Sequence, residues 1–123
     1  MSDVAPEPPL VVGNPRDLDL FTSNEAVGEC LTPEYLGLDH AAYDSTGRRL
    51  ELYLAPGKRH RRLLPDRTEE MVHVRPSADT SDGRDDLIAL LREFLDEIGD
   101  PPLTEATLEQ LLHRAVHTVG YTG

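Results

Sequence analysis

The sequence HAAYDSTGRRLELYL, residues 40–54, decides the fold that we expect for this chain. Its second half alternates: Leu50, Leu52 and Leu54 fall on one side of an extended backbone, and the residues between them fall on the other. Asp44 and Gly47 suit the first and last positions of a type I turn, so the two halves are predicted to pair as a β-hairpin. A hairpin with one apolar face needs a helix or further strands against it.

The segments on either side of this hairpin supply such partners. Residues 17–21 alternate between polar and apolar and predict a first strand. Thr22 and Glu25 have the spacing of a capping box, which predicts a helix that ends before Pro33. After the hairpin, residues 71–75 predict a further strand.

Two helices are predicted at the end of the chain. The first spans about residues 84–98 and the second runs from an N-cap at Thr104 to Gly120, each with one apolar stripe. The short connection between them predicts an antiparallel pair. The fold class is therefore α+β: a small, mostly antiparallel sheet of about four strands, one N-terminal helix and an antiparallel pair of C-terminal helices. The apolar stripes consist of Leu87, Leu90, Leu91, Phe94, Leu95 and Ile98 in the first helix, and of Leu108, Leu111, Leu112, Ala115, Val116 and Val119 in the second.

The length of 123 residues indicates one domain, with enough chain to bury a core without disulfides. Residues 1–16 are rich in proline and predict a flexible tail, with residues 10–12 as the one part of it that could be ordered, so the single α+β domain is expected over residues 17–120. Residues 58–62 form a basic run, which we expect in an irregular, exposed loop.

The formal net charge of −11 is unevenly distributed along the chain. Residues 1–47 carry nine acids and one base, residues 48–67 two acids and seven bases, and residues 76–123 ten acids and three bases. A strongly negative surface repels phosphate, so nucleic acid is not an expected partner, whereas a basic protein is. The N-terminal segment shows no secretory signal and no apolar stretch reaches the length of a membrane span, so a cytoplasmic protein without membrane contact is expected.

The sequence contains no recognisable catalytic signature, and we expect neither an enzyme nor a cofactor. His113 and His117 are four residues apart on a predicted helix, a spacing that can bind a metal. The catalytic glutamate of helical zinc proteases is missing, because Arg114 follows His113. We therefore interpret both histidines as solvated surface residues and predict no metal site. The single cysteine, Cys30, falls on an apolar stripe and is interpreted as a core thiol.

Carboxylates line the polar side of the first C-terminal helix and its ends. A solvated face that keeps the protein soluble is one interpretation, and a docking surface for a basic partner is the other. The polar face of the hairpin, with Arg49, Glu51 and Tyr53, is the alternative partner surface. The residues of the predicted docking surface are Asp85, Asp86, Glu93, Asp96, Glu97 and Asp100.

Residues 17–54 also carry a family resemblance. DLDLF at 17–21, SNEA opening a helix at 23–26, Leu31 with Glu34, and AYDSTGRRL at 42–50 resemble short bacterial immunity proteins of polymorphic or contact-dependent toxin systems. The resemblance implies that the chain inhibits a toxin by tight non-covalent binding and performs no chemistry itself. The resemblance assigns no contact residues to this chain, because each immunity protein is complementary to its own toxin.

Three function hypotheses follow. The first is a cytoplasmic immunity protein that neutralises a cognate toxin by occluding its active site. The second is a non-catalytic adaptor, chaperone or regulatory binding module of a secretion system or other assembly. The third is a metal-dependent enzyme that uses His113 and His117.

Overall fold

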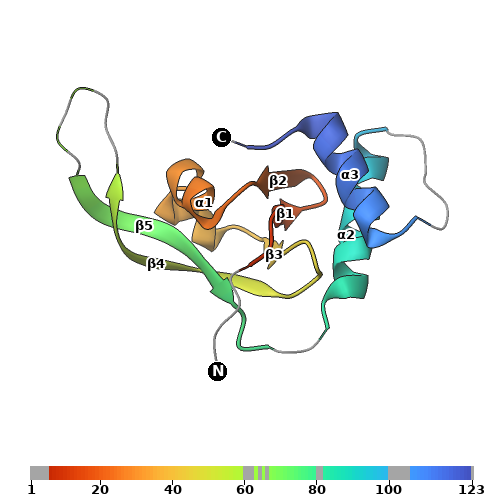
Figure 1. Cartoon of the computed structure of the whole chain (residues 1–123), viewed down its shortest axis with the longest axis horizontal. Coiled ribbons are helices and arrows are strands. Elements are labelled where there is room, and N and C mark those ends of the chain that lie inside the picture. The colour runs from red at the N-terminus through yellow and green to blue at the C-terminus, as the bar shows by residue number, and fades with distance from the viewer. Residues whose placement is uncertain are drawn as a thin grey trace.

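The computed structural model describes residues 6–59, 63, 65, 67–79, 82–99 and 106–122. Within these residues helices and antiparallel strands are mixed along the chain, which confirms the predicted α+β class. The strands form a three-stranded sheet in the order β2-β1-β3 and a two-stranded ribbon of β4 and β5, where the sequence predicts one sheet of about four strands (Figure 1). The elements are β1 (Leu10–Asn14), β2 (Asp17–Phe21), α1 (Asn24–Cys30), the 3-10 helix η1 (Pro33–Gly37), β3 (Ala41–Tyr43), β4 (Leu50–Arg59), β5 (Arg67–Pro76), α2 (Arg84–Glu97) and α3 (Leu108–Val119).

Strand β1 lies at the centre of the three-stranded sheet, between β2 and β3. Leu10, Val11 and Val12 are all buried. The flexible tail predicted over residues 1–16 is therefore corrected at β1, which is the middle strand of the sheet. Consecutive apolar residues suit a strand that is covered on both faces, but the neighbouring prolines, which favour loops, outweighed this signal in the prediction. Residues 1–5 of the predicted tail lie outside the described residues.

The alternation of side chains along β1 divides the core into two clusters. Val11, with Leu20 of β2 and Tyr43 of β3, packs against α2 and α3. Leu10 and Val12 point to the opposite face and pack with residues of α1 and of the β4–β5 ribbon. The small sheet is thus the middle layer, with the two C-terminal helices on one side and α1 with the ribbon on the other (Figure 1).

The predicted hairpin of residues 40–54 forms its turn, but its two halves scarcely pair. Gly47 N–H donates to Asp44 O (3.1 Å) across the turn, as expected. Beyond the turn, only Tyr43 and Arg49 form a bridge, because β3 pairs with β1 and β4 turns away to pair with β5. The ten-residue pairing with β5 offers β4 many more backbone hydrogen bonds than the three-residue β3 could.

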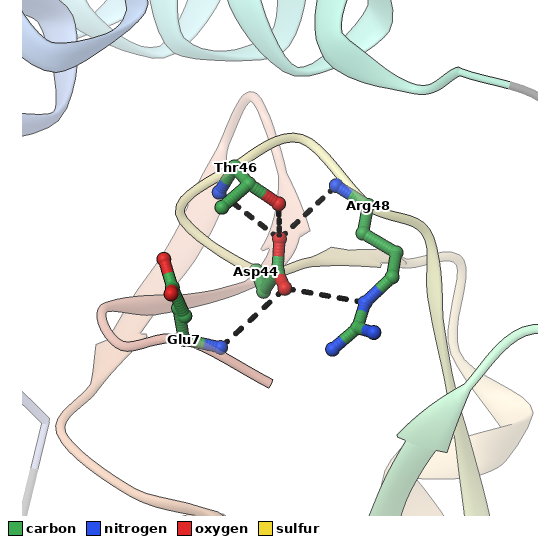
Figure 2. Close-up of polar contacts among 4 residues, drawn as sticks. All are labelled: Glu7, Asp44, Thr46 and Arg48. Carbon is green, nitrogen blue, oxygen red and sulfur yellow. Dashed lines mark hydrogen bonds and ion pairs between the residues drawn. The ribbon is translucent and has the colours of Figure 1, made fainter. Parts of the chain in front are cut away.

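The turn is anchored by the buried carboxylate of Asp44 (Figure 2). Its Oδ1 accepts hydrogen bonds from the backbone N–H of Thr46 (3.0 Å) and of Arg48 (3.1 Å) and from the Thr46 hydroxyl (2.6 Å). Its Oδ2 accepts from Glu7 N–H (3.4 Å) and lies 3.3 Å from Nε of Arg48. One carboxylate therefore joins the turn to the segment that precedes β1.

The ribbon of β4 and β5 extends away from the rest of the molecule (Figure 1). Of the predicted apolar face, Leu50 is buried, Leu52 is partly buried, and Leu54 is 37% exposed, so burial decreases along β4. Lys58 and Arg59 of the basic run belong to β4, which corrects the irregular loop predicted there. The other residues of the run, 60–62, lie outside the described residues.

Helix α1 lies beside β5 and covers part of its outer edge. The Asn24 side chain donates to Val74 O (3.3 Å), and its Oδ1 accepts from Val74 N–H (3.0 Å). The N-cap is Ser23, whose hydroxyl accepts from Ala26 N–H (3.1 Å), so the predicted cap at Thr22 is wrong by one residue. This register places Asn24 in the first turn, where its amide satisfies both backbone groups of Val74.

Asn24→Ala is expected to lower the free energy of unfolding by about 1–2 kcal/mol, because two hydrogen bonds to the β5 edge are lost together. Urea denaturation of the variant and the wild type measures this difference. Glu25→Ala, at the next and exposed position of α1, is the control and should be nearly neutral. Equal midpoints for Asn24→Ala and the wild type would show that the edge contact contributes nothing to stability.

The two C-terminal helices are confirmed and pack on each other, while their antiparallel orientation stays a prediction. Helix α2 is followed by Gly99 with a φ of +79°, the left-handed conformation expected at this helix end. Helix α3 begins at a capping box of Thr107 and Gln110. The predicted N-cap at Thr104 is therefore wrong, and that residue lies outside the described part of the chain.

Candidate functional site

Helix α2 has one buried and one acidic side. Leu87, Leu91, Phe94 and Leu95 are buried against the sheet and α3, which fixes the rotation of the helix. At 100° per residue the opposite side carries five exposed carboxylates, which we call the acidic face. The structure thus places together every predicted docking residue except Asp100, which lies outside the described residues. The acidic face consists of Asp85, Asp86, Glu93, Asp96 and Glu97.

Part of the acidic face opposes the stability of its own helix. Asp85 and Asp86 lie in the first turn, where the helix dipole favours negative charge. Asp96 and Glu97 lie in the last turn, which contains no basic residue, and there the dipole disfavours them. Glu93 and Glu97 are also like charges four residues apart, which is unfavourable in a helix. The C-terminal half of the acidic face is therefore not explained by helix stability.

Arg49 contacts the N-terminal end of the acidic face. Its guanidinium forms an ion pair with Asp86, and its Nε lies 3.6 Å from a carboxylate oxygen of Asp79. The hydrogen bond that the Arg49 guanidinium donates to Asp86 raises the pKa of Arg49. Arg49 also lies over the Tyr43 ring, 5.8 Å from its centroid. This residue, predicted for the alternative surface on the hairpin, therefore belongs with α2.

A groove of about 480 Å³ borders the C-terminal half of the acidic face. Glu93 and Glu97 form its α2 wall, and the β1–β2 turn with Asp39 forms the other. Asn14 fixes that turn, because its Oδ1 accepts from the N–H groups of Arg16 (2.9 Å) and Asp17 (3.1 Å) and its amide donates to Asp39 O (3.1 Å). Three carboxylates thus face one guanidinium, that of Arg16, in this groove.

Sequence reasoning missed Asn14, Arg16 and Asp39 as parts of this site. The first two fall in the segment that was predicted as a tail. The available signal was the Asn-Pro dipeptide at residues 14–15, which favours a turn. Asp39 carries no signal of its own, because only the fold brings it to the β1–β2 turn.

The alternative surface is a ladder of stacked side chains on the β4–β5 ribbon. Glu51 accepts from Arg75 Nε (2.5 Å), and the Arg75 guanidinium lies 4.3 Å from the centroid of the Tyr53 ring. Tyr53 in turn stacks on His73, with ring centroids 5.4 Å apart. Glu51 and Tyr53 are therefore brought together as predicted, but with Arg75 and His73 rather than with Arg49. The cross-strand pairs Glu51–Arg75 and Tyr53–His73 explain this arrangement.

His113 and His117 both lie exposed on α3. Among the residues that the structure describes, no group of three or more histidine, cysteine, aspartate or glutamate side chains is placed to hold a metal ion. Within the same residues, no helix combines the length and apolar character that crossing a bilayer requires.

Comparisons of this chain with models of protein families, with curated proteins and with solved structures gave no match. Among the described residues, the acidic face, with the groove beside it, brings together five of the six residues predicted for the docking surface.

Proposed function

We propose that this protein is an immunity protein that neutralises a toxin by covering a basic surface of it with the acidic face of α2. The observation that carries the proposal is the concentration of five exposed carboxylates on one side of one helix. Two of them occupy the last turn, where they cost helix stability. Charges that a protein keeps against local stability are expected at functional surfaces.

The chemistry of the partner follows from this surface. A toxin that acts on nucleic acid or nucleotides binds phosphate and therefore has a basic cleft. Carboxylates placed over such a cleft occupy the positions of the phosphates and exclude the substrate. The groove beside Glu93 and Glu97 is wide enough to receive a lysine or arginine side chain of the toxin. The protein acts in the cytoplasm in this proposal, does no chemistry and needs no cofactor.

The test is the rate at which the protein associates with the toxin encoded by the neighbouring gene. In the triple variant Glu93→Gln, Asp96→Asn and Glu97→Gln, the association rate should fall about tenfold at low salt, because long-range attraction steers the encounter. The salt dependence of the rate should weaken as well, since screening acts on the same charges. Stopped-flow fluorescence or surface plasmon resonance at several salt concentrations measures both effects.

A matched control removes the same number of charges elsewhere. The triple variant Glu25→Gln, Glu29→Gln and Glu70→Gln changes exposed carboxylates of α1 and β5, away from the acidic face. It should associate at nearly the wild-type rate. Equal slowing in both variants would show that net charge, and not this face, directs the encounter. A rate that is unchanged and independent of salt would move the site to the ladder of Glu51, Tyr53, His73 and Arg75.

A further inference from the structure

A cleft of about 480 Å³ lies on the side of the molecule where the segment before β1, the turn after β3 and helix α3 meet. Its volume falls within the range of sites that hold small ligands. Leu112 and Val116 of α3 and the Tyr121 ring give it apolar lining, and Pro8 and Pro9 add to it from the other side. The groove of the acidic face has different lining residues, so the two hollows are separate sites.

The walls of this cleft are fixed by the fold. On one wall, Ser45 N–H donates to Glu7 O (2.9 Å), and Glu7 N–H reaches the buried Asp44 carboxylate (Figure 2). On the other wall, Leu112 belongs to the buried core. Tyr121 is held between two backbone hydrogen bonds, from Gly120 N–H to Val116 O (2.8 Å) and from Thr122 N–H to Leu20 O (2.8 Å). The cleft is therefore preformed.

Charged groups of both signs line the cleft. Arg84, the first residue of α2, supplies a guanidinium, while Glu7 and Glu109 supply carboxylates. In the described part of the chain none of these three side chains takes part in an ion pair. His113 lines the same cleft one helical turn after Glu109 and adds a polar group. The cleft thus offers a positive group and two negative groups that do not neutralise one another.

From this arrangement we infer that the cleft binds a small zwitterion with an apolar body, namely a short peptide with free ends. Arg84 binds the carboxylate of the peptide, Glu7 and Glu109 bind its ammonium group, and the apolar side chains lie over Leu112 and Val116. A simple anion would meet two carboxylates in the same cleft, and a simple cation would meet the guanidinium. A ligand that carries both charges satisfies all three groups. This inference is independent of the proposed toxin inhibition.

The first test uses three peptides on the wild-type protein. Leucyl-leucine carries both charges, its N-acetyl form lacks the ammonium group, and its C-terminal amide lacks the carboxylate. NMR titration of the ¹⁵N-labelled protein should show that leucyl-leucine shifts the amide signals of the cleft residues. Each capped peptide should bind about tenfold more weakly, because it leaves one charged group of the cleft without a partner. Equal affinities for the three peptides, or no shifts at the cleft with leucyl-leucine, would overturn the inference.

The second test assigns the charges to residues. In Arg84→Gln, leucyl-leucine should bind about tenfold more weakly than it binds to the wild type. The C-terminal amide of leucyl-leucine should bind to this variant as well as leucyl-leucine itself does. The N-acetyl peptide should remain the weaker ligand in this variant, because Glu7 and Glu109 are intact. Arg92→Gln, on the exposed side of the same helix and outside the cleft, is the matched control and should bind like the wild type. Equal losses in Arg84→Gln and Arg92→Gln would overturn the assignment of the carboxylate to Arg84.

Discussion

Asp44→Ala is expected to lower the free energy of unfolding by about 3–5 kcal/mol, a large share of the stability of a small domain. Asp44 is 1% exposed, and its side chain accepts hydrogen bonds from Thr46, from Arg48 N–H and from Glu7 N–H. Alanine leaves these donors without their acceptor and removes the carboxylate from the side of the Arg48 guanidinium. Urea denaturation followed by circular dichroism measures the loss.

Two further variants separate the causes of this loss. Asp44→Asn keeps the size of the side chain and one acceptor oxygen but removes the charge, so its effect should be intermediate. Asp39→Ala removes an exposed aspartate from the segment before β3 and should change stability by no more than about 0.5 kcal/mol. If Asp44→Ala lowered the free energy of unfolding no more than Asp39→Ala does, the hydrogen bonds of Asp44 would not be what stabilises the turn.

Gly13→Ala is expected to lower the free energy of unfolding by at least about 3 kcal/mol, or to prevent folding altogether. Gly13 has a φ of +140°, which residues with a side chain rarely adopt. A Cβ at this position would lie 2.1 Å from Asp17 O and 2.9 Å from Leu18 Cα, both backbone atoms of the paired strand β2. Backbone held in a sheet cannot yield as a flexible side chain can, so β1 and β2 would have to separate.

The control for this variant is Gly99→Ala. Gly99 also has a positive φ, +79°, but a Cβ there would meet no atom of the described residues within 4 Å. Gly99→Ala should therefore lower the free energy of unfolding only by the cost of the left-handed backbone conformation, about 1–2 kcal/mol. Comparing the two variants by thermal denaturation isolates the contribution of the close approach between β1 and β2. Similar losses in both would show that φ alone, and not the missing space, requires glycine at residue 13.

Elements with a regular pattern could be predicted from the sequence. The stripe of Leu87, Leu91, Phe94 and Leu95 gave the position of α2 and the side that it exposes, because helix rotation follows from the apolar side. The strand β2 and the turn at Asp44 followed from alternation and turn chemistry. What a local pattern could not give is the choice of partner: β3 and β4 are joined by a tight turn, yet β3 pairs with β1 and β4 pairs with β5.

Two errors in the predicted strands have a common physical origin in proline and glycine. Proline favours loops, so the segment before residue 16 was assigned to a tail although it contains the buried strand β1. Pro56 and Gly57 likewise indicated the end of a strand, but β4 continues through both to Arg59. A strand with only one neighbour tolerates proline at positions whose N–H points away from that neighbour. The pairing of β4 with β5 alone leaves its other edge open to proline.

The candidate site was predictable to the extent that it lies on one helix. The five carboxylates of the acidic face share a side of α2 because of helical periodicity, and this could be read from their spacing. The groove beside them combines α2 with the β1–β2 turn and with Asp39, three segments that are far apart in the chain. The cleft lined by Arg84 and Glu109 is formed in the same way, so neither hollow has a sequence signature.

The extension of the β4–β5 ribbon beyond the rest of the molecule has a consequence for local opening (Figure 1). Toward the base of the ribbon, Leu50 and Val74 are buried, whereas Pro56 and Glu70, a cross-strand pair farther out, are exposed. Hydrogen bonds between strands that bury little apolar surface open without unfolding of the core. Amide protons of the outer ribbon should therefore exchange with deuterium by fraying from the free end, while those of β1 exchange only when the whole domain unfolds.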